Sequence, residues 1–230
     1  MTRPNNQQHT CWDNFYSQSS NLKSYLLDII GHLHYILSIL ANLPKSILEI
    51  GSGTGYHSCF LSYFGITTIA LDINRGVIEI ARRNKAQFRG KVDFVVASAF
   101  NLPFKDNCFD ICFSQGLLEH FDNNLIYLFL DSSLRVGRSV ILSVPSNHYP
   151  CKDFGDERLL TPNVWHSIIT KCKRLYEDKT YLTDADYYLG LNVLGRSSSL
   201  HELIGPFHII ISITLKPSAR ISRKNHSGLN

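Results

Sequence analysis

Five short apolar runs alternate with helical segments between residues 47 and 144. Each run is bounded by proline, glycine or charged residues, which is typical of buried strands. The predicted strands cover residues 47–50, 67–71, 91–97, 111–114 and 139–144. The segments with helical periodicity cover residues 56–64, 77–85 and 124–136. Strands that alternate with helices predict a parallel, doubly wound α/β sheet with helices on both faces.

Six apolar side chains before the first strand repeat at steps of three and four, as the buried face of one helix would. They are Leu22, Leu26, Ile29, Leu33, Ile36 and Leu40. We therefore expect residues 21–42 to form a single helix that packs on the sheet. Lys23, Asp28, His32 and His34 interrupt the segment, so a membrane span is not expected. We interpret the two histidines as surface residues rather than ligands.

The strand–helix alternation stops after the fifth apolar run. A helix is predicted to begin at Thr161-Pro162, because proline fits the first helical position. A late strand is predicted at Phe207–Leu215 and a shorter one within residues 181–193. No repeat or linker divides the chain, so we expect one domain. Its predicted sections are a mobile arm (1–20), a packing helix (21–42), a core (46–144), an insertion (145–180), final strands (181–216) and a tail (217–230).

The composition is that of an ordinary globular protein, with 44% hydrophobic and 18% charged residues and a formal charge of +4. Basic residues crowd the tail, which weakens the case for a nucleic-acid surface. The six cysteines show no paired spacing, so we expect reduced thiols and no metal site. Residues 1–20 lack the apolar core of a signal peptide, and we expect a cytoplasmic protein.

A glycine-rich loop joins the first predicted strand to the helix that follows it. Gly51, Gly53 and Gly55 alternate after Glu49, and glycine lets a backbone turn tightly and approach a ligand closely. A dinucleotide site would instead space its glycines as G-x-G-x-x-G. Asp72 ends the second strand, near the separation of roughly twenty residues at which an acidic residue meets a ribose in such folds. The arrangement predicts a nucleotide-type cofactor site.

Three segments resemble motifs of class I S-adenosylmethionine (SAM)-dependent methyltransferases of the small-molecule kind. The alternating glycines resemble the first motif of that family. Residues 98–110 resemble its G-D-A-x-x-L-P-F-x-D-x-S-F-D segment, and residues 115–121 resemble its S-x-x-x-L-E-H element. The family's adenine-binding Asp is Ser98 here, and a neutral hydroxyl accepts a weaker hydrogen bond than a carboxylate does.

The resemblance implies a Rossmann-like, doubly wound sheet of seven strands, mostly parallel with the last strand antiparallel. It implies SAM as the cofactor and S-adenosyl-L-homocysteine as the product. It also implies that Glu49 orders the glycine loop. The residues that the resemblance places at the cofactor are Glu49, Gly51, Ser52, Gly53, Gly55, Asp72, Ile73, Ser98, Ala99, Phe100, Gln115 and Gly116.

The implied function is transfer of a methyl group from SAM to an O, N or C nucleophile of a small molecule. His120 and His148 are the candidate catalytic residues, and the insertion at 145–180 would cover the acceptor. The expected partner is a small-molecule acceptor. Neither a membrane nor a nucleic acid is expected as a partner, and the oligomeric state stays open. Three other classes also stay open. They are an NAD-dependent oxidoreductase, a tRNA or other nucleic-acid methyltransferase, and a non-catalytic SAM-fold binding protein, for which Ser98 is the best argument.

Overall fold

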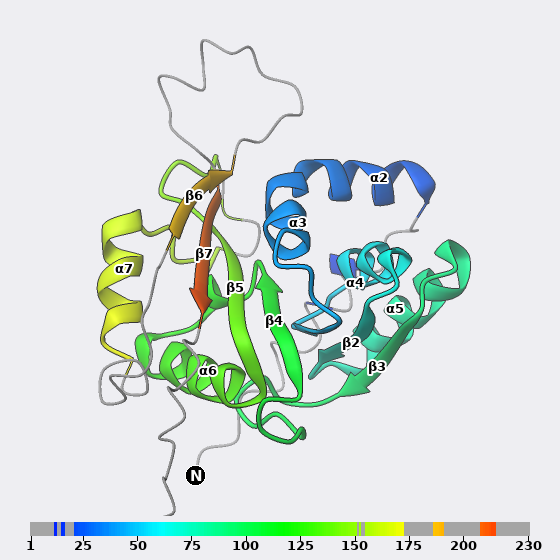
Figure 1. The fold of residues 1–230 in the computed structure, drawn as a ribbon. Coiled ribbons are helices and arrows are strands. Elements are labelled where there is room, and N and C mark those ends of the chain that lie inside the picture. Colours follow the sequence, from blue (N-terminus) through cyan, green and yellow to red (C-terminus); the bar gives the residue numbers. More distant parts are fainter. Residues whose placement is uncertain are drawn as a thin grey trace, which may run out of the picture.

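Seven strands in the described part of the chain form one sheet in the computed structural model of the protein (Figure 1). The structure describes residues 12, 15, 16, 21–150, 152, 155–172, 186–190 and 208–214, of which 186–190 and 214 are described by their backbone alone. The strands are β1 (Ser46–Ile50), β2 (Thr67–Asp72), β3 (Val92–Val96), β4 (Phe109–Gln115), β5 (Gly137–Pro145), β6 (Asp186–Gly190) and β7 (His208–Thr214).

The order of the strands across the sheet is β3-β2-β1-β4-β5-β7-β6. Strands β1 to β5 run parallel to one another, and β7 pairs antiparallel with both β5 and β6. The first strand lies in the middle of the parallel part, and the chain winds outward from it in both directions. The predicted Rossmann-like sheet, with its antiparallel last strand, is confirmed.

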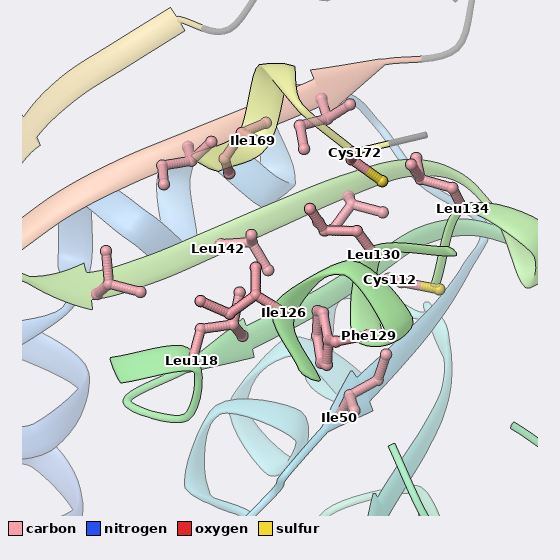
Figure 2. Packing of buried hydrophobic residues seen from close by; sticks show 14 of the residues in the cluster. Ile50, Cys112, Leu118, Ile126, Phe129, Leu130, Leu134, Leu142, Ile169 and Cys172 are labelled. Carbon is pink, nitrogen blue, oxygen red and sulfur yellow. The ribbon is translucent and has the colours of Figure 1, made fainter. Parts of the chain in front are cut away.

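Helices cover both faces of this sheet (Figure 1). They are α2 (Leu22–Gly31), α3 (Leu33–Leu40), α4 (Tyr56–Leu61), α5 (Arg75–Phe88), α6 (Asn123–Val136) and α7 (Pro162–Thr170), with short 3-10 turns η1 (Ser62–Phe64) and η2 (Leu118–His120). Successive strand residues point to opposite faces, so β5 sends Val140 and Leu142 into one core and Ile141 into the other. The first core includes α6 and α7, and Figure 2 shows Phe129 of α6 within it. The second core includes α2, α3 and α4.

The predicted single helix at residues 21–42 is two helices, so this part of the prediction is wrong. The helix breaks at His32, whose backbone angles (φ −109°, ψ 20°) are not helical and whose N–H closes α2 by bonding to Asp28 O at 3.1 Å. The predicted apolar face is only partly buried. Three of its leucines are exposed: Leu22 by 60%, Leu26 by 45% and Leu33 by 40%. The buried residues of the two helices are Tyr25, Ile29, Tyr35, Ile36 and Ile39.

The elements after the core follow the prediction closely. Helix α7 begins at Pro162, and the Thr161 side chain caps it by accepting the Val164 N–H. Strands β6 and β7 lie within the two predicted ranges. Strand β5 begins at Gly137, earlier than predicted, because α6 leads into it directly. The arm, apart from residues 12, 15 and 16, and the tail at 217–230 lie outside the described residues. Within the described chain, no helix has the length and apolar character needed to cross a membrane.

Candidate functional site

The glycine loop between β1 and α4 lies at the carboxyl ends of the parallel strands, where open α/β sheets bind ligands. Gly51, Gly53 and Gly55 all have positive φ angles, of 73°, 50° and 71°. A Cβ atom on Gly51 would lie 2.8 Å from Leu117 Cδ2, and one on Gly55 would lie 2.8 Å from Phe94 Cζ. Any other residue at these positions would strain the backbone and displace a neighbour.

Hydrogen bonds fix the curve of this loop. The backbone N–H groups of Gly51 and Ser52 both donate to Leu71 O at 2.9 Å. Glu49, which is 3% exposed, accepts from the Ser58 N–H of α4 through Oε2 at 3.2 Å. A carboxylate at the start of a helix also interacts favourably with the helix dipole. Glu49 therefore ties the end of β1 to the helix that follows the loop.

Asp72, at the end of β2, faces the same loop. Its Oδ2 accepts from Gly53 N at 3.3 Å, and its Oδ1 accepts from Asn74 N at 2.9 Å. Burial raises the pKa of Asp72 above its usual value, and these two backbone N–H groups oppose that shift. The carboxylate thus lies between the loop and the start of α5. A carboxylate can accept hydrogen bonds from two neighbouring hydroxyl groups at once, as a ribose would offer.

A cavity of about 310 Å³ opens beside the loop. Its described lining combines carboxylates, histidines and aromatic rings, and includes no Lys or Arg. The titratable acids and histidines are Asp28, Glu49, Glu119, Glu157, His32, His57, His120 and His208. The larger aromatic residues are Trp12, Phe15, Tyr16, Tyr56 and Tyr149. This lining favours a neutral, aromatic or cationic ligand over a polyanion.

The predicted cofactor residues fall into two groups. Those that line the cavity are Glu49, Gly51, Ser52, Gly53, Gln115 and Gly116. Those outside its lining are Gly55, Asp72, Ile73, Ser98, Ala99 and Phe100. Within the second group, Gly55 belongs to the glycine loop. The other five residues lie at or just after the carboxyl ends of β2 and β3, which are paired strands with Asp72 opposite Val96. Ser98 Oγ accepts the Phe100 N–H at 3.3 Å. The predicted site therefore extends from the cavity along the sheet edge toward β3.

The two candidate catalytic residues have different surroundings. His120 lines the cavity, and its Nδ1 lies 2.8 Å from Asp156 Oδ1. The Trp12 ring meets the His120 ring edge-on, with 5.2 Å between ring centroids. His148 is exposed and is absent from the cavity lining. The structure thus brings His120, but not His148, to the cavity.

A second polar group in the cavity was missed by sequence reasoning. His57 Nε2 lies 3.1 Å from Asp28 Oδ2, and His57 Nδ1 lies 3.7 Å from Glu49 Oε1. Burial alone would lower the pKa of His57, but the two carboxylates raise it to about 10. Asp28 and Glu49 thus place a carboxylate on each side of the His57 ring.

Two further histidines extend this group. His32 has 17% of its side chain exposed, so its interpretation as a surface residue is corrected, whereas His34 is exposed as predicted. Burial, followed by the nearby His57, lowers the pKa of His32. Burial, followed by His32, lowers the pKa of His208 to about 4. The members come from α2, the α2–α3 junction, α4 and β7, so no local spacing in the sequence could have indicated them.

Comparison with known protein families shows which family the core resembles. The family described as methyltransferase domain matches residues 48–139, which include the glycine loop, Asp72 and His120. This core is a class I SAM-dependent methyltransferase domain. SAM is accordingly the cofactor of the domain, and the alternative of an NAD-dependent oxidoreductase is set aside. The glycine loop and Asp72 fit SAM, because they offer a closely approachable backbone and an acceptor for ribose hydroxyls.

Curated relatives match the methyltransferase domain over part of their length. A demethylmenaquinone methyltransferase from Clavibacter sepedonicus is 32% identical over 103 residues, which cover 44% of this chain and 42% of that protein. A malonyl-[acyl-carrier protein] O-methyltransferase from Pectobacterium atrosepticum is 31% identical over 89 residues, covering 37% and 34% of the two chains. The matched segments therefore span less than half of these relatives.

Solved structures share the fold over a longer stretch. Magnesium protoporphyrin IX methyltransferase from Synechocystis PCC 6803, with bound SAM, superposes with a TM-score of 0.62 at 14% identity and covers 94% of this chain and 100% of that one. Phosphoethanolamine N-methyltransferase 1 from Haemonchus contortus gives a TM-score of 0.64 at 15% identity, covering 91% and 48%. At these identities the likeness shows the fold of the methyltransferase domain.

We expect Asp72→Ala to weaken SAM binding by about 1.5–3 kcal/mol, the contribution of a hydrogen bond to a charged group. Asp72→Asn keeps one acceptor oxygen and should lose less. Isothermal titration calorimetry measures both. The matched control is Asp93→Ala, because Asp93 is an exposed carboxylate on the neighbouring strand β3. Unchanged affinity in Asp72→Ala would exclude Asp72 as the ribose acceptor.

Proposed function

We propose that this protein transfers the methyl group of SAM to an O, N or C nucleophile of a small molecule bound in the 310 Å³ cavity. One observation carries the proposal. The cavity and the glycine loop share the residues Gly51, Ser52 and Gly53, so a cofactor on the loop would border the cavity directly. An acceptor in the cavity would then lie beside the reactive end of the cofactor.

The cofactor residues divide according to the two ends of an elongated ligand. We assign the adenosine end to Asp72 and to Ser98–Phe100 along β2 and β3, and the methionine end to the loop and to Gln115 and Gly116. SAM supplies a methyl group that its sulfonium already activates. The protein residues then have to orient the two reactants and exclude water. Tyr16 contributes to this enclosure, since its hydroxyl would lie 2.8 Å from a Cβ placed on Gly53.

The chemistry of the lining supports a small-molecule acceptor. Nucleic-acid binding depends on Lys and Arg that neutralise phosphates, and the described lining of the cavity has neither. Trp12 stacks on Tyr16 with a centroid distance of 5.9 Å, and Phe15 meets Tyr16 edge-on. Such aromatic walls suit a flat or apolar acceptor. The relatives described above are named for demethylmenaquinone and for malonyl-[acyl-carrier protein], and neither of these acceptors is a nucleic acid.

His120 is the residue that we assign as general base. A carboxylate oxygen only accepts, so the contact with Asp156 makes His120 Nδ1 the donor and leaves Nε2 as the acceptor in the neutral ring. Asp156 would hold the ring in place while Nε2 takes a proton from the acceptor. A base of this kind is needed where the acceptor nucleophile is protonated at neutral pH.

His120→Gln should lower kcat by about 10²–10⁴-fold, the usual contribution of a positioned general base. The SAM dissociation constant should stay unchanged, because His120 is not among the residues assigned to the cofactor. His148→Gln is the matched control and should keep full turnover, since His148 is exposed and outside the cavity lining. If His120→Gln retained full kcat across the pH range, the acceptor would be methylated without this base.

Calorimetry with SAM, NAD and an RNA mixture in parallel tests the proposed function at its first step. The proposal predicts binding of SAM with one site per chain and no binding of NAD or RNA. A chain that binds SAM but yields no methylated product from any acceptor pool would be a non-catalytic SAM-binding protein. Ser98 favours this second candidate, because it replaces the charged adenine acceptor of the family with a neutral hydroxyl.

A further inference from the structure

Asp28, His32 and His57 form a compact cluster on the side of the cavity formed by α2 and α4. Each of the three offers a nitrogen or oxygen atom, and these atoms all lie within 4.8 Å of one another. Two of the residues are partly buried and His57 is buried, so bulk water does not surround the cluster. Two imidazoles and one carboxylate are a common ligand set for divalent transition metals.

The surroundings of His57 would suit a metal ligand. Its Nε2 is buried and makes no hydrogen bond of acceptable geometry in the described chain, although Asp28 Oδ2 lies 3.1 Å away. Two ligand atoms at about 2.0–2.1 Å from one Zn²⁺ in tetrahedral geometry are about 3.3 Å apart. The observed separation of 3.1 Å is close to this value, and the buried Nε2 has no hydrogen-bond partner in the described chain.

The outer surroundings of the two histidines fit the same interpretation. Metal-bound histidines usually donate their second ring N–H to a carboxylate or a backbone carbonyl. His57 Nδ1 lies 3.7 Å from Glu49 Oε1, and His32 Nδ1 lies 2.9 Å from Asp28 O. Because a carbonyl oxygen only accepts, His32 Nδ1 is the donor, and Nε2 of the neutral ring keeps its lone pair. His208 lies next to His32, with 5.4 Å between ring centroids, outside this group of three.

We propose that Asp28, His32 and His57 bind a divalent transition-metal ion, with Zn²⁺ as the reference ion, at the wall of the acceptor cavity. Three protein ligands leave a coordination position for water or for an acceptor atom. An ion there would lower the pKa of a bound hydroxyl group and so prepare it as a nucleophile. The metal site goes beyond the proposed methyl transfer and can be tested without any acceptor.

The test is a titration of chelator-treated, tag-free protein with Zn²⁺ by calorimetry, together with the visible absorption spectrum of the Co²⁺-loaded protein. The wild type should bind one ion per chain. Asp28→Asn and His32→Gln should each lower the affinity by at least about 10-fold, since loss of even an outer partner of a metal ligand costs that much. His34→Gln should bind as the wild type does, because His34 is an exposed histidine on α3.

Two further variants control for misfolding and for metal binding at another cluster. His57 is buried, so circular dichroism and SAM affinity must show that His57→Gln is folded before its loss of metal is counted. His120→Gln distinguishes the site from a second cluster, formed by His120, Asp156 and Glu157, whose ligand atoms also lie within 4.8 Å of one another. The proposal predicts that His120→Gln keeps the ion.

Two outcomes would overturn the proposal. One is a wild-type protein that binds SAM but neither Zn²⁺ nor Co²⁺. In that case Asp28, His57 and Glu49 would form an ion-paired network around a protonated imidazole. The other is loss of the ion in His120→Gln but not in the Asp28 and His32 variants. Because SAM affinity is measured on the same samples, failure of the metal site is separate from failure of the methyltransferase assignment.

Discussion

Gly51→Ala is expected to lower SAM affinity by at least about 100-fold, because the cofactor requires this loop backbone in its observed shape. Gly51 has a φ of 73°, which costs an L-residue roughly 1–2 kcal/mol. The added Cβ would also lie 2.8 Å from Leu117 Cδ2, so the loop or Leu117 has to move. Such a movement would disturb the adjoining Ser52 and Gly53, which line the cavity. Calorimetric titration with SAM measures the loss.

Gly65→Ala is the matched control for this experiment. Gly65 has a φ of 74°, but no atom lies within 4 Å of the position that its Cβ would take. The substitution should therefore lower the free energy of unfolding by about 1–2 kcal/mol, as the left-handed backbone predicts, and leave SAM affinity unchanged. Equal affinities for Gly51→Ala and the wild type would show that SAM does not depend on this loop.

Phe129→Ala is expected to lower the free energy of unfolding by about 3–5 kcal/mol, the usual cost of removing a buried aromatic ring. Phe129 is 0% exposed and belongs to the core cluster that also contains Ile50 and Leu142 (Figure 2). The loss combines the transfer free energy of the ring with the cavity that it leaves. Urea unfolding, followed by circular dichroism, measures the change.

Leu128→Ala provides the comparison on the same helix. Leu128 is 51% exposed, so its truncation removes little buried surface and should change the free energy of unfolding by no more than about 0.5 kcal/mol. Similar losses in the two variants would mean that the face of α6 that carries Phe129 is not the buried one. The pair thus tests the orientation of α6 on the sheet.

The central part of the fold could be predicted from sequence because its signals are local. The run Ile47–Ile50 and the glycines after it specify a buried strand and a turn without reference to distant residues. The same holds for Pro162, which fixes the start of α7. The alternation of strands and helices then gives the parallel sheet, since only a few connections between such elements are possible.

Features that depend on tertiary contacts could not be predicted in this way. The steps of three and four from Leu22 to Leu40 suit one helix, yet the chain bends at His32, where the side chain bonds to Asp28 O within the cavity wall. The cluster around His57 joins residues from elements that are distant in sequence. Its members lie together because α2, α4 and β7 all contribute to the wall of one cavity.

Methyl transfer in this cavity is tested most directly by incubating the protein with pooled metabolites and SAM that carries a deuterated methyl group, followed by mass spectrometry. A labelled small molecule should form with the wild type and with His148→Gln, and it should be lost with Gly51→Ala. Label found only in RNA or protein, or equal labelling of small molecules by Gly51→Ala, would contradict methyl transfer in this cavity.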